Sequence, residues 1–247
     1  MVRWALPLMI AALLLGAACS DDSNKNDTGP TPDTTKIDQA ITDKGPQPDK
    51  GDVDQGPVTQ KVETYVPADN EVPGWTEDPT KGFKACTTDA DCKSPIKCDT
   101  TNGVCPGVDS GYTTKEIDDL IDGEHDPYAT EGCTGFAGQH YKKDFNAGSC
   151  KGTLELKIWD MNTAAGAKKM YDADKLKAET GAGLTFETIP NVQTAGIIAD
   201  DAPGWRVYAH KSTYIISMFA MYSDPACKAD LKSCAMTWAD TLTKKLP

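Results

Sequence analysis

The sequence is poor in the residues that nucleic-acid binding and zinc binding require. It has 25 Lys and Arg against 37 Asp and Glu, a net charge of -12 and a pI near 4.7. Phosphate binding needs clustered cations, and no basic stripe with interleaved aromatic residues is present. There are only three histidines and no Cys-x-x-Cys pair at metal-ligand spacing. We therefore expect no nucleic-acid partner and no cofactor.

Long apolar runs are also scarce: one extends from Trp4 to Ala18, and no second one follows. This run is too short to span a bilayer and ends in small residues, as a signal peptide does. Its last residues, Leu13 to Cys19, match the lipobox of a bacterial lipoprotein signal. We predict a signal peptide over residues 1–18 and a lipidated, palmitate-bearing Cys19. The alternative is ordinary cleavage after Ala18, which leaves a free cysteine.

Lipidation would place the protein in the cell envelope, attached to a membrane by lipid alone. One acyl chain binds only marginally, so the full acylation of a bacterial lipoprotein is needed for stable attachment. We expect the outer membrane, on its periplasmic or surface side.

Residues 19–60 have few large apolar side chains and many Asp, Pro, Gly, Thr and Lys. Such a segment cannot bury enough apolar surface to offset its ordering entropy. We predict a disordered acidic linker between the anchor and a folded domain.

Residues 61–247 read as one α+β domain, with an antiparallel sheet covered on one face by two to three helices. Alternating apolar residues predict strands, and the 3.6-residue period predicts helices. The strands are expected at 138–145, 153–161, 186–189, 194–199, 205–210 and 213–222. Helices are expected at 112–121, from a cap at Asn162 or Thr163 to Gly181, and after Asp224, with an apolar stripe made by Leu231, Ala235, Trp238, Leu242 and Leu246.

Besides Cys19 the chain has eight cysteines, an even number that suits disulfides in an oxidising compartment. The string from Cys86 to Cys105 has no room for a hydrophobic core, so its order must come from cross-links. Four cysteines outside it, Cys133, Cys150, Cys227 and Cys234, allow three connectivities. Of these we expect Cys133–Cys150 and Cys227–Cys234, the second with regular helix beginning only after Cys227.

The spacing of Cys86, Cys92, Cys98 and Cys105 is similar to small cysteine-rich segments such as the amino-terminal part of Dickkopf proteins. This resemblance implies that the first cysteine pairs with the third and the second with the fourth. The expected disulfides are then Cys86–Cys98 and Cys92–Cys105, within a cysteine-rich insert spanning residues 84–108.

A second resemblance covers most of residues 70 to 245. It rests on the Gly-Trp of Val72–Trp75, the helix end and turn of Ile117–Tyr128, and the strand and Ala-rich helix of Leu156–Ala167. These motifs resemble a domain family of unknown function found in bacterial exported proteins. The resemblance implies a fold and no activity. The chain departs from the pattern by its cysteine-rich insert and by Glu124, His125 and Asp126 after the glycine.

We expect a non-catalytic module that binds an envelope protein or a small molecule on the open face of the sheet or in a groove near Trp75 and Trp205. Neither a Gly-x-Ser-x-Gly elbow nor a histidine in a triad context is present. The candidate binding residues are Trp75, Asp122, Glu124, Tyr128 and Trp205.

The alternative is a metal-assisted hydrolase centred on Glu124, His125 and Asp126, since carboxylates and one imidazole suit divalent cations. The simpler interpretation is a helix end capped by Gly123, with acidic groups facing water.

Overall fold

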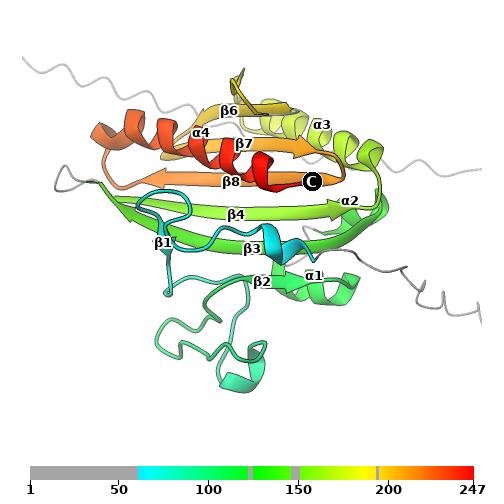
Figure 1. Cartoon of the computed structure of the whole chain (residues 1–247), viewed down its shortest axis with the longest axis vertical. Coiled ribbons are helices and arrows are strands. Elements are labelled where there is room, and N and C mark those ends of the chain that lie inside the picture. The colour runs from blue at the N-terminus through cyan, green and yellow to red at the C-terminus, as the bar shows by residue number, and fades with distance from the viewer. Residues whose placement is uncertain (1–60, 122–124, 146–150, 193–194) are drawn as a thin grey trace, which may run out of the picture. The chain divides into compact units, whose positions relative to one another are not determined.

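The computed structural model describes residues 61–121, 125–145, 151–192 and 195–247. Within them, eight strands form one antiparallel sheet in the order β1-β3-β4-β8-β7-β6-β5, with β2 also paired to β3 (Figure 1). The strands are β1 (Thr76–Glu77), β2 (Asp109–Gly111), β3 (Cys133–Asp144), β4 (Lys151–Met161), β5 (Phe186–Thr188), β6 (Ala195–Asp201), β7 (Gly204–Lys211) and β8 (Tyr214–Tyr222). The predicted α+β class is confirmed.

Four α-helices and three short 3-10 helices are present in the described residues. They are η1 (Val62–Tyr65), η2 (Asp89–Asp91), α1 (Thr114–Ile121), α2 (Asp126–Thr130), α3 (Ala164–Gly181), η3 (Pro225–Cys227) and α4 (Lys228–Lys245). The predicted cap of the central helix is Thr163, whose side chain accepts a hydrogen bond from the Gly166 amide at 3.0 Å. Local side-chain chemistry therefore fixes where α3 begins.

Helix α4 covers one face of the sheet and buries the predicted apolar stripe. Leu231, Trp238 and Leu242 are fully buried in one cluster with the sheet residues Leu154 and Ile216. Because side chains alternate along a strand, these sheet residues share a face. The predicted apolar stripe of α4 and its packing against the sheet are confirmed.

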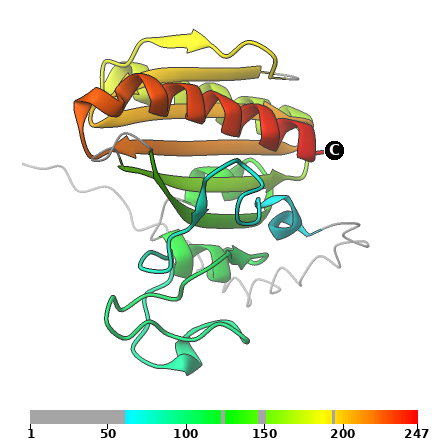
Figure 2. The same ribbon diagram turned by 60° about the vertical axis from the view of Figure 1, so that its left-hand side comes forward.

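The other face also carries helices, which corrects the expectation of a single covered face. Ala167 and Met170 of α3 cluster with Trp159 and Ile215, whose side chains alternate with those under α4. Figures 1 and 2 show α3 and α4 on opposite sides of the sheet. The reason is that Trp159 and Ile215 lie on the face that was expected to stay open, and large apolar side chains need cover.

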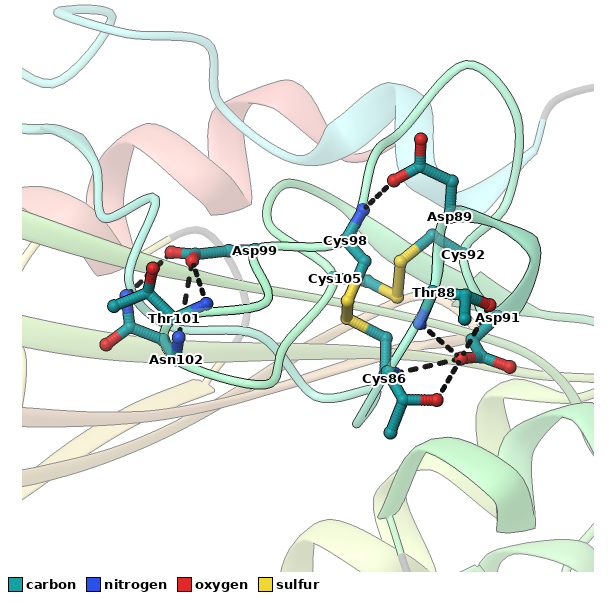
Figure 3. The surroundings of a disulfide bond; sticks show 11 residues. Cys86, Thr88, Asp89, Asp91, Cys92, Cys98, Asp99, Thr101, Asn102 and Cys105 are labelled. Carbon is teal, nitrogen blue, oxygen red and sulfur yellow. Dashed lines mark hydrogen bonds between the residues drawn. A yellow bond between two sulfur atoms is a disulfide. The ribbon is translucent and has the colours of Figure 1, made fainter.

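The cysteine-rich insert has the two disulfides that the resemblance implied. Cys86 bonds to Cys98 and Cys92 to Cys105, as Figure 3 shows. Aspartate side chains hold the loops between them: the Asp91 carboxylate accepts hydrogen bonds from the amides of Thr87 and Thr88, each at 2.8 Å. These bonds lower the pKa of Asp91 to about 2. Covalent and local polar contacts replace a hydrophobic core here.

The two remaining predicted disulfides are wrong. Cys133 and Cys234 are free thiols, whereas Cys227 is disulfide-bonded to a partner outside the described residues. Regular helix does begin after Cys227, at Lys228, but the chain does not curl back to Cys234. Seven residues along a helix separate two side chains by about 10 Å, beyond disulfide reach. Cys150 itself lies outside the described residues.

Candidate ligand-binding cleft

A cleft of about 760 Å³ lies between α3 and the sheet face that α3 covers only in part. One wall comes from α3, with Met170, Ala173, Asp174 and Lys177 among its lining residues. The floor comes from β4, β7 and β8. Its side chains are Glu155, Lys157, Trp159, Arg206, Tyr208, Ser217 and Phe219.

Strand register places the floor residues in two parallel rows. Phe219 is paired with Glu155 on one side and with Arg206 on the other. Ser217 lies in the same way between Lys157 and Tyr208. Because adjacent strands are about 4.8 Å apart, each row spans about 10 Å between its outer residues. The floor therefore has polar groups at its edges and Phe219 and Ser217 in the middle.

The charged side chains of the floor are already engaged with partners of opposite charge. Arg206 Nε donates to Asp201 Oδ2 at 2.7 Å, and the guanidinium carbon lies 4.8 Å from the centre of the Phe219 ring. Lys157 Nζ is 3.3 Å from Glu155 Oε1. These contacts hold the long side chains in fixed positions beside the cleft.

On the α3 side, the Tyr128 hydroxyl donates to the Asp174 carboxylate. The ring of Tyr128 stacks on Trp159 with 3.8 Å between ring centres. Trp159 lines the cleft, and its buried indole N–H has no hydrogen-bond partner in the part of the chain that the structure describes.

Burial perturbs the titration of the floor residues. It lowers the pKa of Arg206, but the hydrogen bond and charge of Asp201, together with the contribution of Tyr208, outweigh this effect and the pKa ends above its ordinary value. The pKa of Tyr208 is raised, mainly by burial. At neutral pH the floor therefore presents a permanent guanidinium cation and a neutral phenol.

The two tryptophans of the predicted groove, Trp75 and Trp205, are both buried in the structure. Trp75 is 1% exposed and packs edge-on against Trp238, with 6.0 Å between ring centres. Trp205 is buried, and its indole nitrogen donates to the Lys228 carbonyl at 2.9 Å. Both tryptophans belong to the core under α4, which the sequence could not distinguish from a surface platform because aromatic residues serve both.

The acidic turn is described only in part, since Asp122 and Glu124 lie outside the described residues. His125 is 1% exposed, and its Nδ1 lies 3.3 Å from Asp118 Oδ1. Asp126, the first residue of α2, is exposed. The histidine of this turn is therefore part of the core, with its ring stacked parallel to Trp159.

One cluster of potential metal ligands is present in the described residues. The one group of three whose ligand atoms lie within 4.8 Å of one another is Cys86, Cys92 and Cys105. Their sulfurs are committed to the two disulfides of the insert. The described residues His125 and Asp126 are not brought into a common ligand set.

Of the predicted binding residues that the structure describes, which are Trp75, Tyr128 and Trp205, Tyr128 alone lines the cleft. Sequence reasoning missed Asp174, Asp201, Arg206 and Phe219. The sequence pattern could have indicated Phe219 and Arg206. Each alternates along its strand with buried residues, so its side chain lies on the opposite face of the sheet from theirs. No sequence pattern identifies Asp174 and Asp201 as cleft residues. Only the fold brings α3 and the end of β6 to the same cleft.

The comparisons with known proteins assign no family to this chain. No family model and no curated protein matches the sequence. Among solved structures, the extracellular domain of PknH from Mycobacterium tuberculosis is similar, with 15% identity and a TM-score of 0.36, over 56% of this chain and 77% of that one. The resemblance to the exported family of unknown function stays a prediction. None of the described helices has the length and apolar character needed to cross a membrane.

Proposed function

We propose that this chain is a lipid-anchored cell-envelope protein whose folded domain binds a small ligand in the cleft beside α3, without converting it. The observation that carries the proposal is the cleft itself. Its volume, about 760 Å³, falls within the range typical of small-molecule sites. Aromatic and aliphatic side chains combined with a few fixed polar groups are also typical of such sites.

The state of the cleft carboxylates favours binding over catalysis. Glu155 is paired with Lys157, Asp201 with Arg206, and Asp174 accepts a hydrogen bond from Tyr128. A general base needs a lone pair within reach of a substrate proton and a pKa near the working pH. Carboxylates engaged by cations or hydroxyl groups instead serve to orient neighbouring donors.

The anchor is supported by the lipobox ending at Cys19 and by the linker of residues 19–60. Disulfides in the insert and at Cys227 suit an oxidising compartment, which export provides. The outer membrane, on its periplasmic or surface side, is the proposed location.

The anchor is tested by Cys19→Ser, with Cys234→Ser as the matched control. Cells are labelled with a fatty-acid analogue, and membranes are separated from soluble protein. The control should carry label and sediment with membranes, whereas the Cys19→Ser protein should be exported without label. Label retained on the Cys19→Ser protein would contradict lipidation at this residue.

The binding site is tested by filling the cleft. Ala173 is an exposed residue of α3 that lines the cleft, whereas Ala165, also exposed on α3, does not. Ala173→Trp should block the cleft and Ala165→Trp should leave it open, at the same cost in helix propensity. The readout is ligand-observed NMR with a mixture of neutral, anionic and cationic fragments on the mature chain. Fragments should bind the wild type and Ala165→Trp but not Ala173→Trp; a fragment set insensitive to both variants would contradict the proposed site.

A further inference from the structure

The charges that line the cleft cancel one another. Glu155, Asp174 and Asp201 carry three negative charges, and Lys157, Lys177 and Arg206 carry three positive charges. Two of the cations and all three carboxylates have a partner within the site. Most clefts that bind a charged ligand carry an excess of the opposite charge. The lining of this cleft carries no excess of either charge.

From this balance we infer that the ligand is a neutral, hydroxyl-rich molecule, of the chemical class of oligosaccharides. The inference rests on the proposed function of the cleft and adds the class of ligand to it. It is carried by the pairing of the charges and by their placement around an apolar centre.

A charged ligand bound on the floor would have to separate an existing pair; Lys177, on α3, is the one lining cation outside these two pairs. An anion drawn to Arg206 would compete with Asp201, whose side chain is 22% exposed, and a cation drawn to Glu155 would compete with Lys157, whose side chain is 15% exposed. Removing one member of a partly buried ion pair leaves the other poorly solvated and is unfavourable. A neutral ligand avoids this cost because it leaves both pairs intact.

The same pairs can still bind hydroxyl groups. A guanidinium has five N–H donors, and a carboxylate has about four lone-pair sites, so one ionic contact does not exhaust either group. Arg206 with Asp201, and Lys157 with Glu155, each present a donor next to an acceptor. Two neighbouring hydroxyls on a sugar ring need this combination, since each hydroxyl both donates and accepts.

The apolar centre of the floor suits the remaining surface of such a ring. Phe219 lies between Glu155 and Arg206 in register, and its side chain is partly exposed. Met170 and Ala173 add apolar atoms from α3. A sugar ring carries hydroxyls at its edge and C–H groups on its faces, so the outer residues of a row about 10 Å wide can reach its edge while Phe219 supports a face.

The test compares trisaccharides that differ in charge, on the mature full-length chain released by Cys19→Ser. The neutral probes are triacetylchitotriose and maltotriose, the cationic probe is chitotriose with free amines, and the anionic probe is trigalacturonate. Calorimetry and saturation-transfer NMR measure binding at low and high salt. We expect at least one neutral probe to bind about ten-fold more tightly than either charged probe. Its Kd should change less than two-fold with salt, because screening acts on charges.

Variants of Arg206 give a second readout. Arg206→Lys keeps the charge but removes the planar fork and its stacking on Phe219, so affinity for the neutral probe should fall about ten-fold. Lys175→Arg, at an ion pair of α3 outside the cleft, is the control and should leave the affinity unchanged. Circular dichroism checks that both variants are folded.

The outcomes separate this inference from the proposed function. Tighter binding of a charged trisaccharide, or neutral binding that weakens strongly with salt, would overturn the ligand class. The ligand class would also be overturned if neither neutral probe binds while fragments bind the wild type and not Ala173→Trp. That result would leave the cleft as a binding site. If Ala173→Trp does not reduce fragment binding, the proposed function itself fails.

Discussion

Arg206 and Phe219 are directly paired across β7 and β8, and the guanidinium carbon of Arg206 lies 4.8 Å from the centre of the Phe219 ring. The same guanidinium donates a hydrogen bond to the Asp201 carboxylate. An arginine fixed by an aromatic ring and a carboxylate has lost most of its rotamer freedom before any ligand arrives. This pre-organisation lowers the entropic cost of binding at the cleft floor.

The contact between these two residues should be measurable as a coupling energy. In a double-mutant cycle of Arg206→Ala and Phe219→Ala, we expect the free energies of unfolding to deviate from additivity by about 0.5–1 kcal/mol, because cation–π contacts at partly exposed sites have this size. Urea denaturation measures each variant. A cycle of Arg206→Ala with Leu176→Ala, an exposed residue of α3, is the control and should be additive.

His125 and Asp126 are neighbours in sequence but should differ in their effect on stability. His125 is 1% exposed and stacked parallel to Trp159, so His125→Ala should lower the free energy of unfolding by about 2 kcal/mol through lost packing. Asp126 is exposed, and Asp126→Ala should change the free energy of unfolding by no more than about 0.5 kcal/mol. Thermal and urea unfolding distinguish the two, and equal effects would be inconsistent with the buried histidine.

The thiol chemistry of the chain gives a third prediction. We expect Cys133 and Cys234 to be free thiols in unreduced, denatured protein. In the native state Cys133 should react slowly with iodoacetamide at pH 8, because burial raises its pKa to about 12. Time-resolved alkylation followed by mass spectrometry measures both. Rapid native labelling of Cys133 would show that this position is more open than the structure has it.

His140 should make part of the stability depend on pH. Burial lowers its pKa below the ordinary value of 6.5, against the opposing pull of Glu155. Since the unfolded chain then binds the proton more readily than the folded one, this contribution is present above pH 6.5 and is lost as the pH falls below it. His140→Gln should therefore show a smaller loss of unfolding free energy between pH 7.5 and 5.5 than the wild type. An unchanged slope would contradict the shift.

The disulfides should order the insert more than the sheet. Each closes a loop of 12 or 13 residues, worth about 3 kcal/mol in the chain-entropy model. The double variant Cys86→Ser/Cys98→Ser should lose amide-exchange protection between residues 86 and 105. Protection in β4 and β8 should persist, because those strands are stabilised by the apolar clusters on both faces. Equal loss in both regions would show that the insert and the sheet unfold together.

The sequence by itself determined the elements that depend on local pattern. Alternation marked β4 and β8, the 3.6-residue period marked α3 and α4, and Thr163 marked the start of α3. These features are set by neighbours within a few residues, where side-chain direction and hydrogen-bonding capacity act directly.

Only the tertiary structure decided which aromatic and charged residues meet. Trp75 and Trp205 became core because α4 packs over them, while Phe219 and Arg206 became cleft floor because α3 leaves their strands partly uncovered. Cys227 and Cys234 stayed unpaired with each other because the helix between them is regular. Each of these outcomes depends on contacts between elements far apart in the chain, and local periodicity carries no information about which faces come together.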